Sequence, residues 1–139
     1  MNQKSTYMQV NEARNAICEI GRRMYQRNYV AANDGNISIR VGDNFVLATP
    51  TGVSKGFMTP EMMCLLTLDG DRVDGHLAPS SEIKMHLRVY SENPQVRAVT
   101  HAHPLIATSY AVAGIELDLA ILPEAVVMLG KVPIAPYAT

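Results

Sequence analysis

The first part of the chain changes from a helical to an extended pattern of apolar residues. Over residues 10–26, apolar side chains recur three or four positions apart with Arg and Glu on the other side, which predicts an amphipathic helix on a core. Residues 37–40 alternate like a half-buried strand, and residues 45–48 form a second apolar run. The Gly42-Asp43-Asn44 segment between them is typical of a hairpin turn. Residues 10–48 are therefore predicted to form a helix followed by a β-hairpin.

The rest of the chain continues with strands and helices in turn. Residues 63–68 read as a third strand that turns at Asp69-Gly70, and residues 96–103 as a strand with a mostly apolar interior. Pro79-Ser80-Ser81 opens a predicted helix with Ser80 as its N-cap, and Pro104 suits the first turn of a helix over residues 105–112. Two short apolar segments, 126–129 and 132–135, follow. Antiparallel hairpins with three helices predict a layered α/β domain with a mixed sheet.

Length and charge narrow the function classes. The chain has 139 residues, which suits one domain over residues 1–139, and 47% of them are hydrophobic. Lys and Arg number 12 against 13 Asp and Glu, so no long-range attraction to nucleic acid or an anionic membrane is expected, although a local phosphate site remains open. The apolar runs are shorter than the ~20 residues that span a bilayer, and residues 1–10 are polar, so we expect a cytoplasmic protein. Cys18 and Cys64 are expected to be buried free thiols.

The sharpest chemical signal is His101-Ala102-His103 within the predicted strand 96–103. Alternate residues of a strand share a face, with Cα atoms about 7 Å apart, so both imidazoles would project the same way. Zinc binds imidazole nitrogen at ~2.0–2.1 Å, and this spacing lets two rings converge on one ion. The alternative is a pair of packed or hydrogen-bonded histidines without a metal.

A second signal lies at the predicted helix start, Pro79-Ser80-Ser81-Glu82. Free N–H groups, the helix dipole and two hydroxyls suit an anion. The alternative is that Ser80 only caps the helix and Glu82 only complements its dipole. His86, four residues after Glu82, is interpreted as packed or hydrogen-bonded beside the site, and His76 as solvent exposed.

Two glycine-containing loops offer further donors for a phosphate. Asp34-Gly35-Asn36 could present a backbone N–H and a side-chain amide, and Thr51-Gly52 could do likewise. Neither has the spacing of a phosphate-binding loop, and each alone is also compatible with an ordinary turn.

In this order, the segments resemble the class II aldolase/adducin family over nearly all of the chain. The matching segments are Gly35-Asn36-Ile37-Ser38-Ile39-Arg40, Thr49-Pro50-Thr51-Gly52-Val53, Pro79-Ser80-Ser81-Glu82, His101-Ala102-His103 and Ala135-Pro136-Tyr137-Ala138-Thr139. The likeness is greatest to the branch of aldolases that act on L-fuculose 1-phosphate. It implies a three-layer α/β/α fold with a mixed, mostly antiparallel sheet, incomplete at its C-terminus.

The resemblance also implies a zinc-dependent lyase with a defined set of site residues. His101 and His103 would bind Zn²⁺, and Glu82 would be the catalytic acid/base that contacts the metal when no substrate is bound. Asn36, Thr51, Gly52, Ser80 and Ser81 would hold the substrate phosphate. The reaction would be a retro-aldol cleavage of a ketose 1-phosphate to dihydroxyacetone phosphate and an aldehyde, in a homotetramer with no nucleic-acid or membrane partner.

The chain departs from the family pattern in two places. The family's third histidine ligand lies in a His-Gly segment beyond the Ala-Pro-Tyr-Ala-Thr stretch, and this chain ends there, so we expect weak zinc binding and little activity from the 139 residues alone. The tyrosine that donates a proton in fuculose-phosphate aldolases aligns with residues 120–124, where this chain has none. The alternatives are a 4-epimerase, dehydratase or decarboxylase of the same family, an adducin-like binding module, or an inactive fragment.

Overall fold

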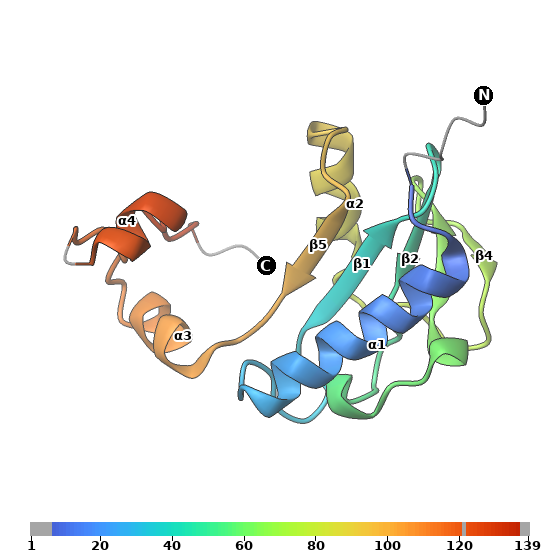
Figure 1. The fold of residues 1–139 in the computed structure, drawn as a ribbon, viewed down its shortest axis with the longest axis horizontal. Helices are drawn as coiled ribbons and strands as arrows, with labels where there is room; N and C mark the ends of the chain where they lie inside the picture. The colour runs from blue at the N-terminus through green and yellow to red at the C-terminus, as the bar shows by residue number, and fades with distance from the viewer. Residues whose placement is uncertain (1–6, 121, 137–139) are drawn as a thin grey trace. The chain divides into compact units, whose positions relative to one another are not determined.

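The computed structural model describes residues 7–120 and 122–136. The chain divides into two compact units, Met1–Ala102 and His103–Thr139. The first unit is built on a five-stranded sheet in the order β4-β3-β2-β1-β5 (Figure 1). Its strands are β1 Asn36–Arg40, β2 Phe45–Ala48, β3 Cys64–Thr67, β4 Arg72–Asp74 and β5 Ala98–His101. All four pairings are antiparallel, so the described sheet has no parallel pair of the mixed kind that the sequence suggested.

Helix α1, Val10–Gln26, forms as the sequence predicts and covers one face of this sheet. Its buried positions recur at helical spacing and include Ala13 and Ile17, which are fully buried. They pack in one cluster with Ile37, Ile39 and Leu47 of the sheet. Each fully buried aliphatic side chain of this kind contributes roughly 1.5–3 kcal/mol to folding.

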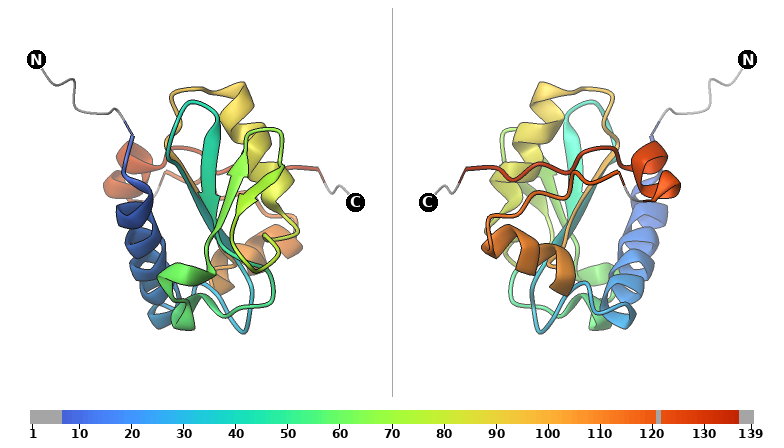
Figure 2. Two further views of the ribbon diagram at one scale, coloured as in Figure 1. Left: turned by 90° about the vertical axis from the view of Figure 1, so that its right-hand side faces the viewer. Right: turned by 90° about the vertical axis from the view of Figure 1, so that its left-hand side faces the viewer.

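Helix α2, Ile83–Glu92, lies on the opposite face. Its buried residues, His86 and Tyr90, contact Ser38, which alternates along β1 with the residues that face α1. The first unit therefore has the expected three layers, which two further views show (Figure 2). Because β1 lies between β2 and β5 and is covered on both faces, Ser38 is fully buried, whereas the sequence suggested a half-buried strand.

The turns before the helices differ from the prediction in detail. The residue that caps α2 is Glu82, not Ser80, and no side chain bonds there as a cap. Ser80 instead accepts a 3.3 Å hydrogen bond from the Glu82 N–H in the preceding turn. Two short 3₁₀ turns, η1 Lys55–Phe57 and η2 Pro60–Met62, occupy the stretch that the sequence indicated was only a loop.

The second unit contains α3, Leu105–Val112, at the predicted place, and α4, Pro123–Met128. Neither helix has a buried residue. An isolated antiparallel bridge joins Leu117 to Val132. The apolar segment at residues 126–129 is thus largely helical, and residues 137–139 of the last family segment lie outside the described part.

Two smaller predictions are confirmed. Cys18 and Cys64 are buried and free, and burial raises the pKa of both thiols. Over the described residues, the longest apolar helical stretches fall short of what would be needed to cross a bilayer.

Candidate functional site

The site begins with a cross-strand pair on the edge of the sheet. Asn36 of β1 lies directly opposite His101 of β5, so both side chains project on the same face. Gly35 makes this approach possible, because a Cβ there would lie 2.8 Å from the His101 carbonyl oxygen and 2.5 Å from Val30 Cγ1. Its backbone also has φ +72°, which glycine adopts without strain.

Glu82 reaches this pair from the turn that precedes α2. The Asn36 side-chain amide donates a hydrogen bond to Glu82 Oε2, and the same oxygen lies 3.1 Å from His101 Nδ1. Asn36 Nδ2 is 3.3 Å from that ring nitrogen. Asn36 is buried, whereas the side chains of His101 and Glu82 are 25% and 47% exposed. Asn36 is therefore held in the protein interior, whereas His101 and Glu82 are accessible to solvent.

The donor set fits a divalent cation. Two ligands of a tetrahedral zinc ion with ~2.0–2.1 Å bonds lie about 3.4 Å apart, close to the 3.1 Å between His101 Nδ1 and Glu82 Oε2. Without a cation, this contact holds when the Nδ1 proton is shared with the carboxylate. A metal ligand offers a lone pair, so cation binding at Nδ1 would require the neutral ring to carry its hydrogen on Nε2.

His103 is placed differently from the prediction. Strand β5 ends at His101, and His103 lies beyond it, exposed, as the first residue of the second unit. The alternation of a strand therefore does not fix its ring on the same face as that of His101, because the ladder ends two residues before His103. Among the described residues, no group of three or more His, Cys, Asp or Glu is close enough to hold a metal ion.

Four of the predicted phosphate residues lie in two adjoining loops, whereas Asn36 is in β1 and contacts Glu82 and His101. Pro50 and Pro79 make an antiparallel bridge, the Thr51 N–H donates to Ala78 O at 2.9 Å, and the Ser80 N–H donates to Thr49 O at 3.1 Å. Gly52 has φ +71° and open space around the position of a Cβ. These contacts bring Thr51 and Gly52 beside Ser80, and Ser81 links them along the chain to Glu82.

Lys55 contacts both loops of the candidate site, although it was not among the predicted site residues. It is 1% exposed, and its ammonium donates to Val53 O at 2.6 Å and to Asn33 O at 3.0 Å. Burial lowers the pKa of Lys55, while Asp34 and Glu82 oppose that effect. The lysine therefore joins the loop that leads to Asn36 with the loop that carries Thr51 and Gly52. A lone lysine between two glycines in a stretch poor in charge was the available signal.

His86 lies beneath the site, as the sequence suggested. It is 1% exposed, and its Nδ1 is 2.7 Å from Ser38 Oγ. Burial lowers the pKa of His86 from its ordinary 6.5 to about 4, and the nearby His101 acts in the same direction while Glu82 opposes it. The ring is therefore neutral at physiological pH.

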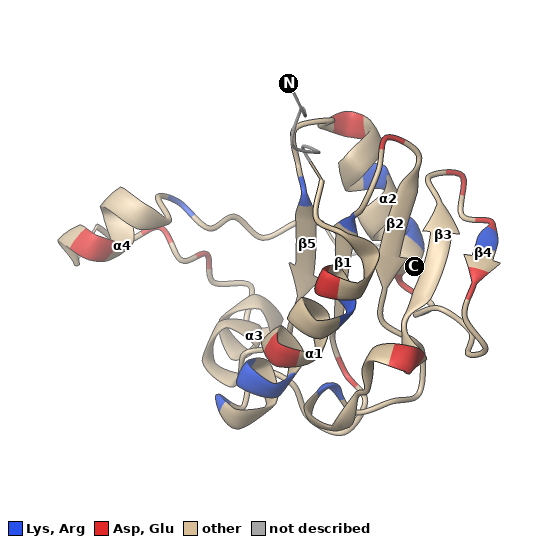
Figure 3. Ribbon diagram, turned by 45° about the vertical axis from the view of Figure 1, so that its right-hand side comes forward, with Lys and Arg blue, Asp and Glu red and all other residues tan. Residues whose placement is uncertain are grey.

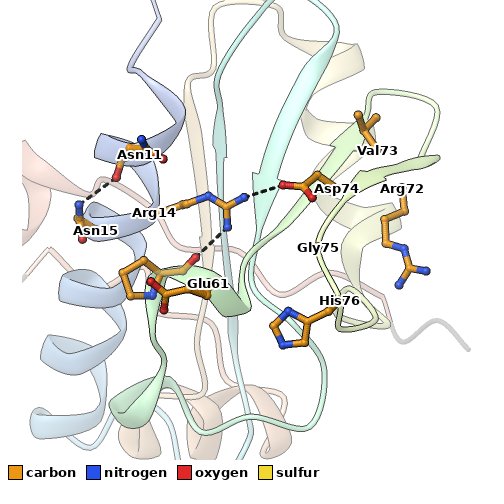
Figure 4. A pocket seen from close by; sticks show the side chains of 10 residues that line it. Asn11, Arg14, Asn15, Glu61, Arg72, Val73, Asp74, Gly75 and His76 are labelled. Carbon is orange, nitrogen blue, oxygen red and sulfur yellow. Dashed lines mark hydrogen bonds and ion pairs between the residues drawn. The ribbon is translucent and has the colours of Figure 1, made fainter.

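A separate cavity of about 870 Å³ lies between α1, η2 and β4 (Figure 4). The side chain of Arg14 lines this cavity and donates hydrogen bonds to Asp74 Oδ2 at 3.0 Å and to Pro60 O at 2.8 Å. His76 is exposed at its rim, as predicted. None of the predicted site residues lines this cavity.

Basic and acidic residues are interspersed over the first unit, which agrees with the balanced charge of the sequence (Figure 3).

Comparison with known proteins places this site in a family. The family described as the class II aldolase and adducin N-terminal domain matches residues 15–139. An L-fuculose phosphate aldolase of Methanococcus maripaludis is 38% identical over 86% of this chain. A 3-oxo-tetronate 4-phosphate decarboxylase of Haemophilus influenzae is 35% identical over 86% of the chain. A solved structure of an L-fuculose 1-phosphate aldolase covers 98% of the chain at 25% identity with a TM-score of 0.85.

The chain therefore belongs to the class II aldolase and adducin N-terminal domain family. This confirms the resemblance drawn from the sequence motifs, and the solved aldolase confirms the fold class. The chain spans 64% of the aldolase sequence and 58% of the decarboxylase sequence that it matches. The two relatives differ in the reaction for which they are named, so family membership leaves the reaction to be argued from the site.

Proposed function

We propose that this chain forms the phosphate-binding part and much of the metal-binding part of a zinc-dependent lyase that acts on a sugar phosphate. The observation that carries the proposal is the contact of Glu82 with His101 at 3.1 Å, on a sheet edge that Ser80 and Ser81 connect to the loop of Thr51 and Gly52. A carboxylate and an imidazole together suit a cation and a proton transfer, and the adjoining loops suit a phosphate.

Each residue has a proposed role. Thr51, Ser80 and Ser81 offer hydroxyl donors to the phosphate, and Gly52 and Ser81 offer backbone N–H donors. The side-chain amide of Asn36, which also donates to Glu82, is the fifth proposed phosphate residue. Glu82 moves a proton to or from the carbon next to the carbonyl. His101 and His103 hold Zn²⁺, with Glu82 as a further ligand in the absence of substrate. When bound, the ion would stabilise negative charge on the oxygens of the cleaved substrate as a Lewis acid.

The proposed reaction is the retro-aldol cleavage of a ketose 1-phosphate such as L-fuculose 1-phosphate. The bond between C3 and C4 breaks, its electrons form the enediolate of dihydroxyacetone phosphate, and the C4 hydroxyl gives its proton to solvent as the aldehyde forms. Glu82 then protonates the enediolate at C3. Holding the phosphate at a distance fixes the reacting carbons against this carboxyl group. A homotetramer in the cytoplasm stays a prediction.

Decarboxylation of a 3-oxo-tetronate 4-phosphate is the second candidate. Loss of CO₂ from this 3-oxo acid leaves the same enediolate, which again takes up one proton. This route needs no base to deprotonate a substrate hydroxyl, and residues 120–124 contain no tyrosine that could be such a base. The 35% identity to a protein named for this reaction supports it as well.

Dihydroxyacetone phosphate, the product of both routes, is the probe that tests the proposal. We expect it to shift the backbone amide signals of Gly52, Ser80 and Ser81 in NMR spectra of this chain, because these residues form its proposed anion site. Glu82→Gln is expected to preserve these shifts and to lower zinc-dependent release of dihydroxyacetone phosphate by about 10²-fold or more. Glu12→Gln, an exposed change on α1, is the matched control.

The substrate that is turned over decides between the routes. Release from L-fuculose 1-phosphate with an aldehyde supports the aldolase, and release from 3-oxo-tetronate 4-phosphate with CO₂ supports the decarboxylase. If the amide signals of residues 52, 80 and 81 do not shift when dihydroxyacetone phosphate is added, the proposed phosphate site is refuted, and both routes with it.

A further inference from the structure

A chain of buried polar groups runs beneath the candidate site, between β1 and α2. Ser38 Oγ lies 2.7 Å from His86 Nδ1 and 2.8 Å from the Tyr90 hydroxyl, which also donates to Ser38 O at 3.1 Å. The three residues are at most 1% exposed. None of them belongs to the proposed phosphate or metal residues.

Only one arrangement of hydrogens makes all three of these contacts hydrogen bonds at once. Tyr90 has one hydroxyl hydrogen, and the Ser38 carbonyl takes it. The contact between Ser38 Oγ and the Tyr90 oxygen must then use the single hydrogen of Ser38. The contact with His86 therefore requires a hydrogen on Nδ1, so the neutral ring carries a bare lone pair on Nε2.

Two acceptors nearby are buried without a hydrogen-bond partner among the described residues: His86 Nε2 and Asn36 Oδ1. The orientation of the Asn36 amide follows from its bond to Glu82, because a carboxylate accepts only from the NH₂ side. Asn36 and Ser38 lie two residues apart on the same face of β1, about 6.6 Å between Cα atoms. Unpaired buried acceptors of this kind each cost about 1–3 kcal/mol.

We propose that His86 Nε2 and Asn36 Oδ1 bind one buried water molecule by accepting its two hydrogens. A water that donates twice spans up to about 5.6 Å between its acceptors. Asn36 projects beside Ser38 on the face of β1 that His86 contacts from α2. Each acceptor needs a donor, and water supplies two of them in one small molecule. A buried cation could use the same lone pairs, but His86 and Asn36 carry no negative charge that would balance the charge of the cation.

The water links the buried chain to the reacting groups. It holds the Asn36 carbonyl oxygen, so the NH₂ group stays turned toward Glu82 and His101. Tyr90, Ser38 and His86 act through Asn36 and are positioning residues for Glu82. This last link rests on the proposed function, whereas the tautomer and the water do not.

The tautomer of His86 tests the first step without any activity. In a chain labelled with ¹⁵N-histidine, long-range ¹H–¹⁵N spectra at neutral pH should show a protonated Nδ1 and a bare Nε2 for His86. Tyr90→Phe removes the acceptor of the Ser38 hydrogen, so that hydrogen turns to Nδ1 and the two nitrogen signals should exchange character. Tyr29→Phe, a change at a half-exposed tyrosine, should leave them unchanged. A protonated Nε2 in the unaltered chain overturns the inference, and this measurement requires no variant to fold.

The water itself is tested by a high-resolution crystal structure. We expect one ordered water within about 3.2 Å of both His86 Nε2 and Asn36 Oδ1. A protein donor on either atom, or a dry contact between them, would overturn the proposal. The Asn36 side-chain amide signals should shift in His86→Phe and stay in place in His76→Phe, whereas unchanged signals in both variants would contradict the link to Asn36. Failure of dihydroxyacetone phosphate to bind would count only against the proposed function.

Discussion

At the scale of single residues, the buried ring of His86 makes the stability of the fold depend on pH. Its pKa is lowered from 6.5 to about 4, chiefly by burial. Above pH 6.5 the ring is neutral in both the folded and unfolded chain. As the pH falls from there toward 4, only the unfolded chain takes up the proton, so the free energy of unfolding decreases.

The loss attributable to His86 between these pH values is expected to be about 3 kcal/mol, at ~1.4 kcal/mol per pKa unit. Urea unfolding measured across this interval for the unaltered chain and for His86→Phe should converge as the pH falls, because the variant lacks the titrating group. His76→Gln, a change at an exposed histidine, should keep the original pH dependence. Parallel curves for the unaltered chain and His86→Phe would contradict the assignment.

Alanine substitutions at Gly35 and Gly52 distinguish the cost of backbone strain from the cost of a steric clash at the site. Both have positive φ, +72° and +71°, but only at Gly35 would a Cβ meet other atoms, with the His101 carbonyl oxygen at 2.8 Å. Alanine at Gly52 should therefore cost about 1–2 kcal/mol from conformation alone. Alanine at Gly35 should cost a further ~1–3 kcal/mol. Thermal unfolding of the two variants measures the difference in stability. Equal destabilisation would show that the loop at Gly35 moves to relieve the clash.

At the scale of elements, Lys55 joins the two loops from which Asn36 and Thr51 project. Lys55→Met keeps the apolar stem but leaves the carbonyls of Asn33 and Val53 without their donor. We expect a loss of about 1–3 kcal/mol and shifted amide signals in both loops. Lys84→Met, at an exposed position of α2, should change stability by less than ~0.5 kcal/mol. A Lys55 variant as stable as the Lys84 variant would remove Lys55 from this role.

Local patterns were sufficient to predict several elements but not their contacts. The periodicity of α1 and the turn residues between β1 and β2 specify those elements because the signal lies within a few neighbouring residues. The end of β5 at His101, by contrast, depends on where its partner β1 begins, at Asn36, and no local pattern records that register. For the same reason, the contact between Asn36 and Glu82 was not predicted, although both residues were assigned to the site from family motifs.

At the scale of the molecule, the two units differ in how much apolar surface they bury. All fully buried hydrophobic side chains among the described residues lie in the first unit, from Ala13 to Tyr90. In the second unit, Leu105, Val112 and Val127 are 77%, 85% and 81% exposed. The sequence predicted α3 correctly from its apolar run, but an apolar run does not indicate which surface will cover it.

This difference predicts unequal protection of the two units against hydrogen exchange. Local opening costs little free energy where few apolar contacts are lost, so amides of α3 and α4 should exchange much faster than those of α1, β1 and β2. Exchange followed by NMR or mass spectrometry on the 139-residue chain gives the free energy of opening for each helix. Helix α1 is an internal reference, because its buried face packs on the sheet.

The zinc ligands proposed above add a second prediction about α3. Because α3 begins two residues after His103, its opening would also free this proposed ligand while leaving Glu82, Asn36 and His101 in place. Added Zn²⁺ should then slow exchange in α3 if His103 and His101 share the ion, and protection of α3 equal to that of α1 without zinc would contradict this account.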